Sequence, residues 1–358
     1  TIAVTLSCAV VLIILLRKSK RDEEFIKKLS SITIAACFIC TGTTVWYGVS
    51  NGTYPEPFIS EAINGKEHIS LPESAFYRID ISENMDNYPM SWGIPSMRAF
   101  QSVVPSSIME FYPTVGVTRD VASRADTSKF GLRGLFSVKY YFNYLDEDGK
   151  EEKEFTMPGF EYYDTQNGFK IYENKYYIPM GFTFDYYMSE DAYQKQSDTY
   201  SDKILMKAIV LDDEQIEKYS DILKPLDNSE LNLTSYDRYL SDCEDRAKTA
   251  CSSFKEDTKG FTAKITLDKD NLVFFSVPYD KGFTASVDGE TVTVEKTDVG
   301  FMAVKVPAGE HIIRFDYFPE GLKIGFLITL GGIIILLAYL FVFRKERTIR
   351  KENHYDYN

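Results

Sequence analysis

Aromatic and cationic side chains that suit a binding site occur together in one segment, Asn84–Gln101, which is rich in Pro, Gly, Met and Ser. Tyr88 and Trp92 offer ring faces of the kind that stack on the C–H surfaces of sugars. Arg98 supplies a fork of N–H donors that matches phosphate oxygens. These three residues form the candidate binding site. The alternative is that Trp92 fills the core beneath a long loop, since a chain with 25 Tyr and 25 Phe must bury many aromatic rings.

Catalytic motifs are missing from the sequence. It has three histidines, and the zinc-protease, nucleophile-elbow, phosphate-loop and dinucleotide-binding patterns do not occur. His311 begins an expected strand, where a solvated or hydrogen-bonded histidine is the ordinary interpretation. The acidic runs Asp212-Asp213 and Asp146-Glu147-Asp148 are typical of a helix start and a turn. We therefore assign no catalytic residue, no metal ligand and no cofactor to this chain.

Cysteine chemistry is equally sparse. Cys37 and Cys40 have the spacing of a redox or metal motif, but they lie in an apolar segment where Cys acts as a small apolar residue. Cys243 and Cys251 lie in the large polar region. On one continuous helix their Cα atoms are about 12 Å apart, too far for a disulfide. A bridge between them requires a break in that helix.

Composition narrows the class of protein. The chain has 358 residues, a net charge of −13 and 44% hydrophobic residues, so it can bury a substantial core and is not disordered. Five cysteines are too few for a disulfide framework, and the acidic charge argues against nucleic acid as a partner. The chain starts in an apolar run without Met, and we expect its numbering to begin within a longer protein.

Three apolar stretches predict transmembrane helices, which makes the lipid bilayer a partner. Thr1–Leu16 has no charged residue and covers about 24 Å as a helix, so we interpret it as a truncated membrane span. A signal-peptide core is the rival interpretation, but its positive charges should precede the apolar run and here they follow it. Residues 29–49 and 322–343 have the full spanning length, and buried helices of a soluble protein are the remaining alternative.

Charge on the flanking segments predicts the orientation. Residues 17–28 carry a net charge of +3 and residues 344–358 a net charge of +2, so both are expected in the cytoplasm, as a loop and a tail. The intervening residues 50–322 carry −19. We therefore expect residues 50–321 to be extracytoplasmic.

The intervening region is expected to form an α+β domain over residues 50–260, followed by a small antiparallel β-sandwich over residues 261–318. Strands are predicted at Phe76–Ile81, Leu135–Tyr144 and Phe169–Tyr177, a helix at Ser106–Tyr112, and mostly helical structure at Ser189–Ser220 and Thr234–Lys259 with Ser189 and Thr234 as N-caps. The fold class is a membrane protein fragment with transmembrane α-helices and this extracytoplasmic domain.

The predicted sandwich rests on six short alternating strands within Phe261–Phe318. Asp288-Gly289 between two such strands is a hairpin signal. The inward-facing positions predict a core of Phe283, Val287, Val304, Ile313 and Phe315. Residues 319–321 connect the last strand to the third apolar stretch, which places the sandwich close to the outer leaflet.

The sequence resembles the YfhO family of bacterial polytopic membrane proteins over nearly its whole length. The resemblance is carried upstream by Phe76–Asp80, Gly93–Pro95, Phe100–Ser102, Gly134–Tyr140, Glu173–Tyr176 and Pro179–Phe182, and downstream by Phe275–Thr284, Val287–Gly289, Gly300–Val304, Pro307–His311, Phe315–Tyr317 and Gly321–Gly325. One departure is Leu135–Val138, where the family more often has a Leu-Leu-Gly-Val-like run.

The resemblance implies a glycosyltransferase of the GT-C type in the bacterial cell membrane, with several membrane spans. Such proteins use a polyprenyl-phosphate sugar as donor and decorate an envelope polymer such as lipoteichoic acid. The family's catalytic acid is expected in an early outer loop that has no counterpart in this chain. Tyr88, Trp92 and Arg98 then become candidate acceptor-binding residues. A non-catalytic extracytoplasmic binding or scaffold module of the cell envelope is the alternative.

Overall fold

The computed structural model describes residues 23–52, 58–72, 75–146, 148–151 and 154–355, together with Val10, Ile13 and Ile14. The membrane span expected at residues 1–16 therefore falls almost entirely outside the described residues. The chain divides into two units, Thr1–Asn64 and Gly65–Asn358. The first unit contains α2 (Glu23–Asn51) and a short π-helix, η1 (Phe58–Ile63).

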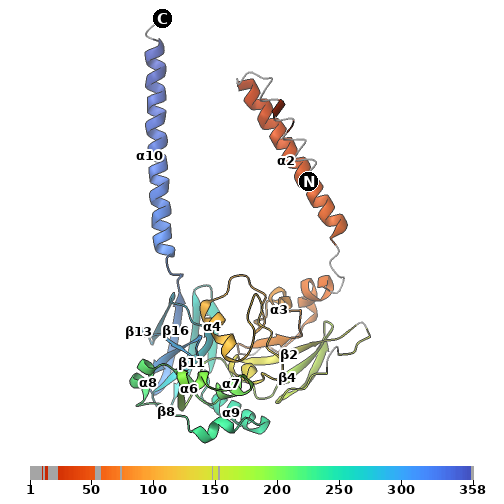
Figure 1. Ribbon diagram of the computed structural model, residues 1–358, viewed down its shortest axis with the longest axis vertical. Coiled ribbons are helices and arrows are strands. Elements are labelled where there is room, and N and C mark those ends of the chain that lie inside the picture. Colours follow the sequence, from red (N-terminus) through yellow and green to blue (C-terminus); the bar gives the residue numbers. More distant parts are fainter. Residues whose placement is uncertain are drawn as a thin grey trace. The chain divides into compact units, whose positions relative to one another are not determined.

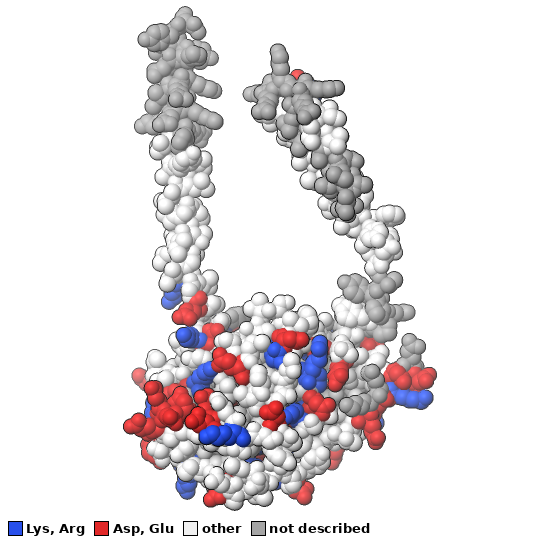
Figure 2. Space-filling model, viewed as in Figure 1, with Lys and Arg blue, Asp and Glu red and all other residues white. Residues whose placement is uncertain are grey.

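Two helices in the described residues are long and apolar enough to cross a membrane. One lies within α2, over Glu24–Asn51, and the other is Leu322–Val342 at the start of α10 (Leu322–Tyr355). The apolar segment of each helix is not buried against any other part of the described structure, which distinguishes both helices from core helices. Figure 2 shows an almost uncharged surface on their described parts and many charged residues on the folded domain. The spans expected at residues 29–49 and 322–343 thus occur as exposed apolar helices.

The first sheet of the domain has the strand order β1-β2-β4-β3. Its strands are β1 (Arg78–Ile81), β2 (Val138–Tyr144), β4 (Phe169–Asn174) and β3 (Phe160–Gln166), and only the β1–β2 pair is parallel. Ile79 lies opposite Tyr140 and Ile81 opposite Phe142, so these apolar side chains share one face of the sheet. Asp80 lies opposite Tyr141 and points to the other face. The alternation therefore separates an apolar face from a face with polar groups.

Two antiparallel sheets are built mainly from residues after 250 (Figure 1), and side chains of both belong to one hydrophobic cluster. The orders are β13-β12-β16-β10-β9 and β14-β15-β11-β5. Their strands are β5 (Phe182–Thr183), β9 (Ser253–Asp257), β10 (Gly260–Leu267), β11 (Asn271–Pro278), β12 (Phe283–Val287), β13 (Glu290–Val292), β14 (Glu295–Thr297), β15 (Phe301–Val306) and β16 (Gly309–Tyr317). Of these strands, β5 and β9 lie before residue 261, where the sandwich was expected to begin, and each adds an edge strand to one sheet.

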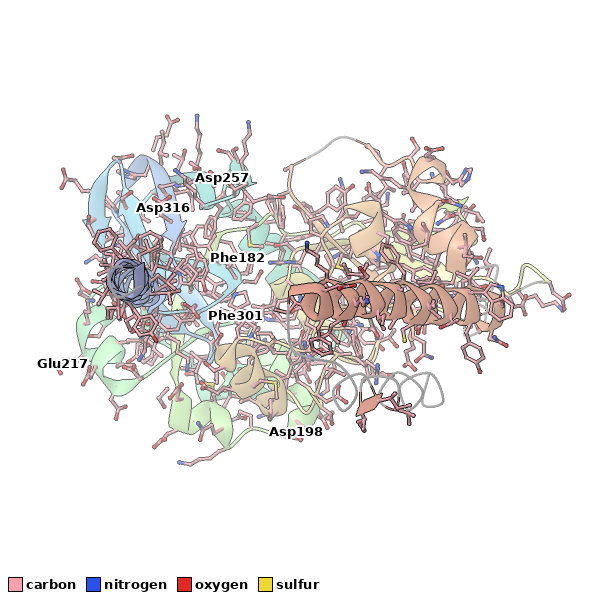
Figure 3. All side chains as sticks on the ribbon, turned by 90° about the horizontal axis from the view of Figure 1, so that it is seen from above. Phe182, Asp198, Glu217, Asp257, Phe301 and Asp316 are labelled. Atoms are coloured by element: carbon pink, nitrogen blue, oxygen red, sulfur yellow. The ribbon has the colours of Figure 1, made fainter. Side chains whose placement is uncertain are left out.

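The interior of these sheets contains the core residues that the alternation predicted. Val304, Ile313 and Phe315 are fully buried, Val287 is buried and Phe283 is partly buried. The Phe315 ring stacks on Phe261 with 4.5 Å between centroids. In Figure 3 Phe182 and Phe301 lie toward the interior of the domain, whereas the exposed acids Asp198, Glu217, Asp257 and Asp316 lie toward its margin.

Short helices and a small parallel sheet, β7-β6-β8, complete the domain. The strands are β6 (Tyr186–Ser189), β7 (Ile209–Leu211) and β8 (Lys224–Pro225). The helices are η2 (Gly65–His68), α3 (Tyr88–Trp92), α4 (Ser106–Thr114), α5 (Gly131–Leu135), α6 (Glu190–Gln194), α7 (Asp198–Ile204), α8 (Asp213–Tyr219), η3 (Asn228–Asn232) and α9 (Tyr236–Lys248). Phe274 of β11 and Phe301 of β15 belong to the same hydrophobic cluster as residues of these helices and of the small sheet. The C-terminal sheets and the rest of the domain are therefore packed together.

Several expected elements differ in the structure. The helical interpretation of residues 189–220 misses β7, whose three apolar residues are all buried and which pairs with β6. The same interpretation of residues 234–259 misses β9, a polar edge strand that pairs with β10. Ser189 caps α6 as expected, but the N-cap of α9 is Ser235, whose hydroxyl accepts from the Arg238 amide, and not Thr234. Short strands stabilised by distant pairing leave little periodic signal of their own.

The cysteines of the domain are not bridged. The helix containing Cys243 ends at Lys248, so a break does lie between Cys243 and Cys251. Both thiols are nevertheless free and buried, Cys243 in the larger core and Cys251 in the core of the C-terminal sheets. Burial raises the pKa of each thiol to about 12, which makes them unreactive at neutral pH.

Candidate functional site

A buried ionic cluster forms on the polar face of the first sheet. The Asp80 carboxylate accepts a hydrogen bond of 2.7 Å from Arg98 Nε and one of 2.7 Å from Arg133 Nη2. Asp80 and Arg133 are fully buried and Arg98 is 2% exposed. Burial alone would raise the pKa of Asp80, but the two guanidinium groups outweigh burial and hold it below its usual range. Two cations around one anion leave this cluster with one positive charge in excess.

The hydrogen-bond donors of Arg133 have more acceptors than those of Arg98. Arg133 donates to the carbonyls of Ala125, Asp126 and Lys129 as well as to Asp80. Arg98 donates through Nη2 to the Ala125 carbonyl, but its buried Nη1 has no hydrogen-bond partner among the described residues. A buried donor without a partner carries a desolvation cost, so such a group indicates a ligand or a water.

Arg98 lines a polar cavity of about 290 Å³. The other lining residues are Ser82, Glu83, Asn84, Asp126, Thr127, Tyr141 and Asn143. Ser82 donates to Asn143 Oδ1 at 3.1 Å and accepts from the Tyr144 amide, which fixes this part of the wall. Burial raises the pKa of Tyr141 to about 12, so its hydroxyl keeps its proton at neutral pH. The cavity thus combines hydroxyl and amide groups with one guanidinium edge.

The three binding residues that the sequence predicted lie on opposite faces of the first sheet. Trp92 is 2% exposed and packs against Phe142 and Phe169 in the apolar cluster that includes Ile79. Tyr88 is partly buried and meets the Trp92 ring edge-on, with 6.1 Å between centroids. Arg98 instead bonds to Asp80, on the opposite face of β1. The structure therefore brings Tyr88 and Trp92 together, and it brings Arg98 to the cavity.

Sequence reasoning missed the residues that surround Arg98. The segment containing Arg98 runs beside β1, where the Ile79 and Met97 amides form backbone hydrogen bonds across the two segments. Asn84–Gln101 also contains α3 and is not entirely a loop. A signal was present, because an acid in the middle of an apolar strand, as Asp80 is, needs a cationic partner when buried. The sequence did not show which arginine would supply it.

Other candidate groups take structural roles. Asp212 forms a capping box with Gln215 at the start of α8, and Asp146 accepts two backbone amides in a turn. His311 bonds to Asp288 at the surface of the hairpin, with 2.6 Å between Nδ1 and Oδ2. Within the described parts of the chain, no group of three or more His, Cys, Asp or Glu residues could hold a metal ion.

The structure thus has a mostly β domain between two helices, in the order of the sequence, that are long and apolar enough to cross a membrane. The chain belongs to the family described as "Bacterial membrane protein YfhO", whose model matches residues 1–242 and 224–329. A curated relative, the "Uncharacterized protein YfhO" of Bacillus subtilis (strain 168), is 34% identical over 80 residues. That match covers 22% of this chain and 9% of the relative. No solved structure gives a significant match.

Proposed function

We propose that this chain belongs to a membrane glycosyltransferase that uses a polyprenyl-phosphate sugar to decorate an envelope polymer such as lipoteichoic acid, and that its domain binds the acceptor. The observation that carries this proposal is the polar cavity with the unpartnered Nη1 of Arg98. An acceptor phosphate oxygen would take that donor, and sugar or glycerol hydroxyls would bond to Tyr141 and Asn143.

Electrostatics limits how a polyanionic acceptor could be held here. The stretch from residue 50 to residue 322 carries −19, so most of its surface repels a phosphate-rich polymer. The cluster of Asp80, Arg98 and Arg133 has one positive charge in excess, which partly offsets the charges of the two carboxylates in the cavity lining. Glu83 and Asp126, at the exposed edge of the cavity, would accept hydrogen bonds from polymer hydroxyls.

The test is polymer glycosylation by the full-length protein in cells that lack their own copy. Arg98→Lys keeps a positive charge beside Asp80 but loses the guanidinium fork. We expect it to lower glycosylation about tenfold or more, the usual cost of removing a hydrogen bond to a charged group. Tyr141→Phe removes only the hydroxyl group, so it should also lower glycosylation while the packing of the ring stays the same.

Matched controls separate binding from folding. Arg124→Lys changes an exposed arginine and Tyr162→Phe an exposed tyrosine of β3, and both should keep wild-type activity. The thermal unfolding midpoints of Tyr141→Phe, Arg124→Lys and Tyr162→Phe should stay close to that of the wild type. The midpoint of Arg98→Lys should fall, because the guanidinium also donates to the buried Ala125 carbonyl, so its activity is compared per amount of folded protein. Activity that falls only in proportion to the amount of folded protein would refute the acceptor site and favour a structural role for Arg98.

We further propose that residues 50–321 are extracytoplasmic, on the basis of the basic segments at 17–28 and 344–358. A cysteine introduced at Lys281, an exposed position before β12, should react with a membrane-impermeant thiol reagent in intact cells. A cysteine introduced at Lys351 should react only after lysis. Labelling of the Lys351 position in intact cells would overturn the proposed orientation.

A further inference from the structure

A second charged cavity lies between α9, β6 and the segment that follows α7. Its volume is about 380 Å³, and it is separate from the cavity at Arg98, with which it shares no lining residue. Arg238, Asp242 and Arg246 recur every four residues along α9 and therefore lie in one row on that helix. Lys207 and Glu230 face this row from other elements.

Two buried cations in this cavity have donor atoms without a hydrogen-bond partner among the described residues. Lys207 is 5% exposed and forms ion pairs with Asp242 Oδ2 at 3.4 Å and with Glu230 Oε2 at 3.5 Å, but its Nζ makes no hydrogen bond of good geometry with the described residues. Arg246 is 7% exposed, and its buried Nε and Nη1 are also unpartnered. Its guanidinium lies over the Phe184 ring, 4.9 Å from the centroid, which does not satisfy the N–H donors.

The acids around the cavity are largely engaged by other groups. Arg238 lies 3.0 Å from Glu230 Oε2 and 3.0 Å from Asp242 Oδ1. At the margin, Asp185 pairs with Lys269, Asp245 pairs with Lys248, and Asp227 accepts the Ser229 amide. The lining therefore holds three cations, Lys207, Arg238 and Arg246, and five carboxylates, of which Asp185 and Asp245 pair with lysines outside the cavity. What the inner group lacks is acceptor atoms placed to take the hydrogen bonds of Lys207 Nζ and of Arg246 Nε and Nη1.

We propose that this cavity binds a phosphoryl group, with Lys207 and Arg246 as its principal donors. Three donor atoms on these two side chains have no hydrogen-bond acceptor among the described residues, and the several terminal oxygens of a phosphate would supply those acceptors. The nearby carboxylates would accept hydrogen bonds from hydroxyl groups on the ligand. This inference is independent of the proposed acceptor site at Arg98.

The test is equilibrium binding of inorganic phosphate to the full chain, purified in a phosphate-free maltoside detergent. Calorimetric titration at constant ionic strength should show saturable binding that chloride does not reproduce. Lys207→Gln and Arg246→Gln should each weaken it about tenfold or more, because each removes donors to a charged ligand. Lys296→Gln, at an exposed ion pair outside the lining of either cavity, should leave the affinity unchanged.

Two further measurements keep the proposal falsifiable. Parallel titrations with glycerol 3-phosphate and with a glycerol phosphodiester distinguish a free monoester from a polymer or lipid diester as the natural source of the group. Should Lys207→Gln fail to fold, phosphate should still raise the unfolding temperature of the wild type and not that of Arg246→Gln. No saturable binding to folded wild-type protein, or unchanged affinity in both variants, would overturn the site.

Discussion

Replacing Asp80 by Asn is expected to lower the free energy of unfolding by about 3–5 kcal/mol, the usual cost of breaking a buried ion pair from one side. The substitution leaves the guanidinium groups of Arg98 and Arg133 in the interior without their anion. Arg133 is fully buried, and Arg98 is 2% exposed and reaches solvent only through the cavity, so water can compensate little for the lost anion.

The measurement is urea unfolding of the detergent-solubilised chain, followed by tryptophan fluorescence in a Trp46→Phe background. Trp46 lies in α2, so this background leaves the buried Trp92 as the reporter of the domain. Glu110→Gln is the control, because the Glu110–Lys296 pair is exposed and such pairs contribute about 0–1 kcal/mol.

Replacing all three charged residues together, Asp80→Leu with Arg98→Met and Arg133→Met, should recover part of the loss, since no unmatched charge then remains.

The contribution of Asp80 to the free energy of unfolding should decrease at low pH. The folded-state pKa of Asp80 is lowered, so its contribution is present above the unfolded pKa and disappears as pH falls. An Asp80→Asn variant as stable as the wild type would show that water reaches both arginines.

The second large effect is expected at Asp298, which should make the domain less stable as pH rises. This side chain is fully buried, its Oδ1 accepts the Val210 amide at 2.6 Å, and its Oδ2 has no partner among the described residues. Burial raises its pKa from 3.8 to about 8. Between about pH 4 and pH 8 the folded state therefore holds a proton that the unfolded state has released.

The wild type should consequently lose up to about 1.4 kcal/mol of unfolding free energy per pH unit relative to Asp298→Asn across this window. Asparagine keeps the acceptor for Val210 and tolerates the φ of 47° found here, so it removes the ionisation with little other change. Above about pH 8 the difference between the two proteins should become constant.

Urea titrations at pH 5, 6, 7 and 8 measure this difference. Glu217→Gln, which changes an exposed carboxyl on α8, is the control for the loss of one negative charge. A wild-type minus Asp298→Asn difference that stays flat from pH 5 to pH 7.5 would mean that Asp298 is ionised in the folded protein, and that water reaches its second oxygen.

The sequence by itself determined the features that depend on neighbouring residues. Uninterrupted apolar runs marked α2 and the start of α10, because spanning length and lack of charge are local properties. Alternation within β10, β12 and β16 correctly placed Ile313 and Phe315 in a core, since successive side chains of a strand point to opposite faces. The quoted motifs were sufficient to identify the family.

The tertiary structure decided which distant residues meet. Asp80, Arg98 and Arg133 come from three separate segments, and no local pattern pairs them. Trp92 and Arg98 are six positions apart, yet they pack on opposite faces of β1 because the chain passes beside that strand between them. The same holds for Lys207 and Arg246, which become neighbours only when α9 packs against the segment after α7. Periodicity fixes the direction of a side chain within its own element, whereas strand register and helix packing fix what it faces.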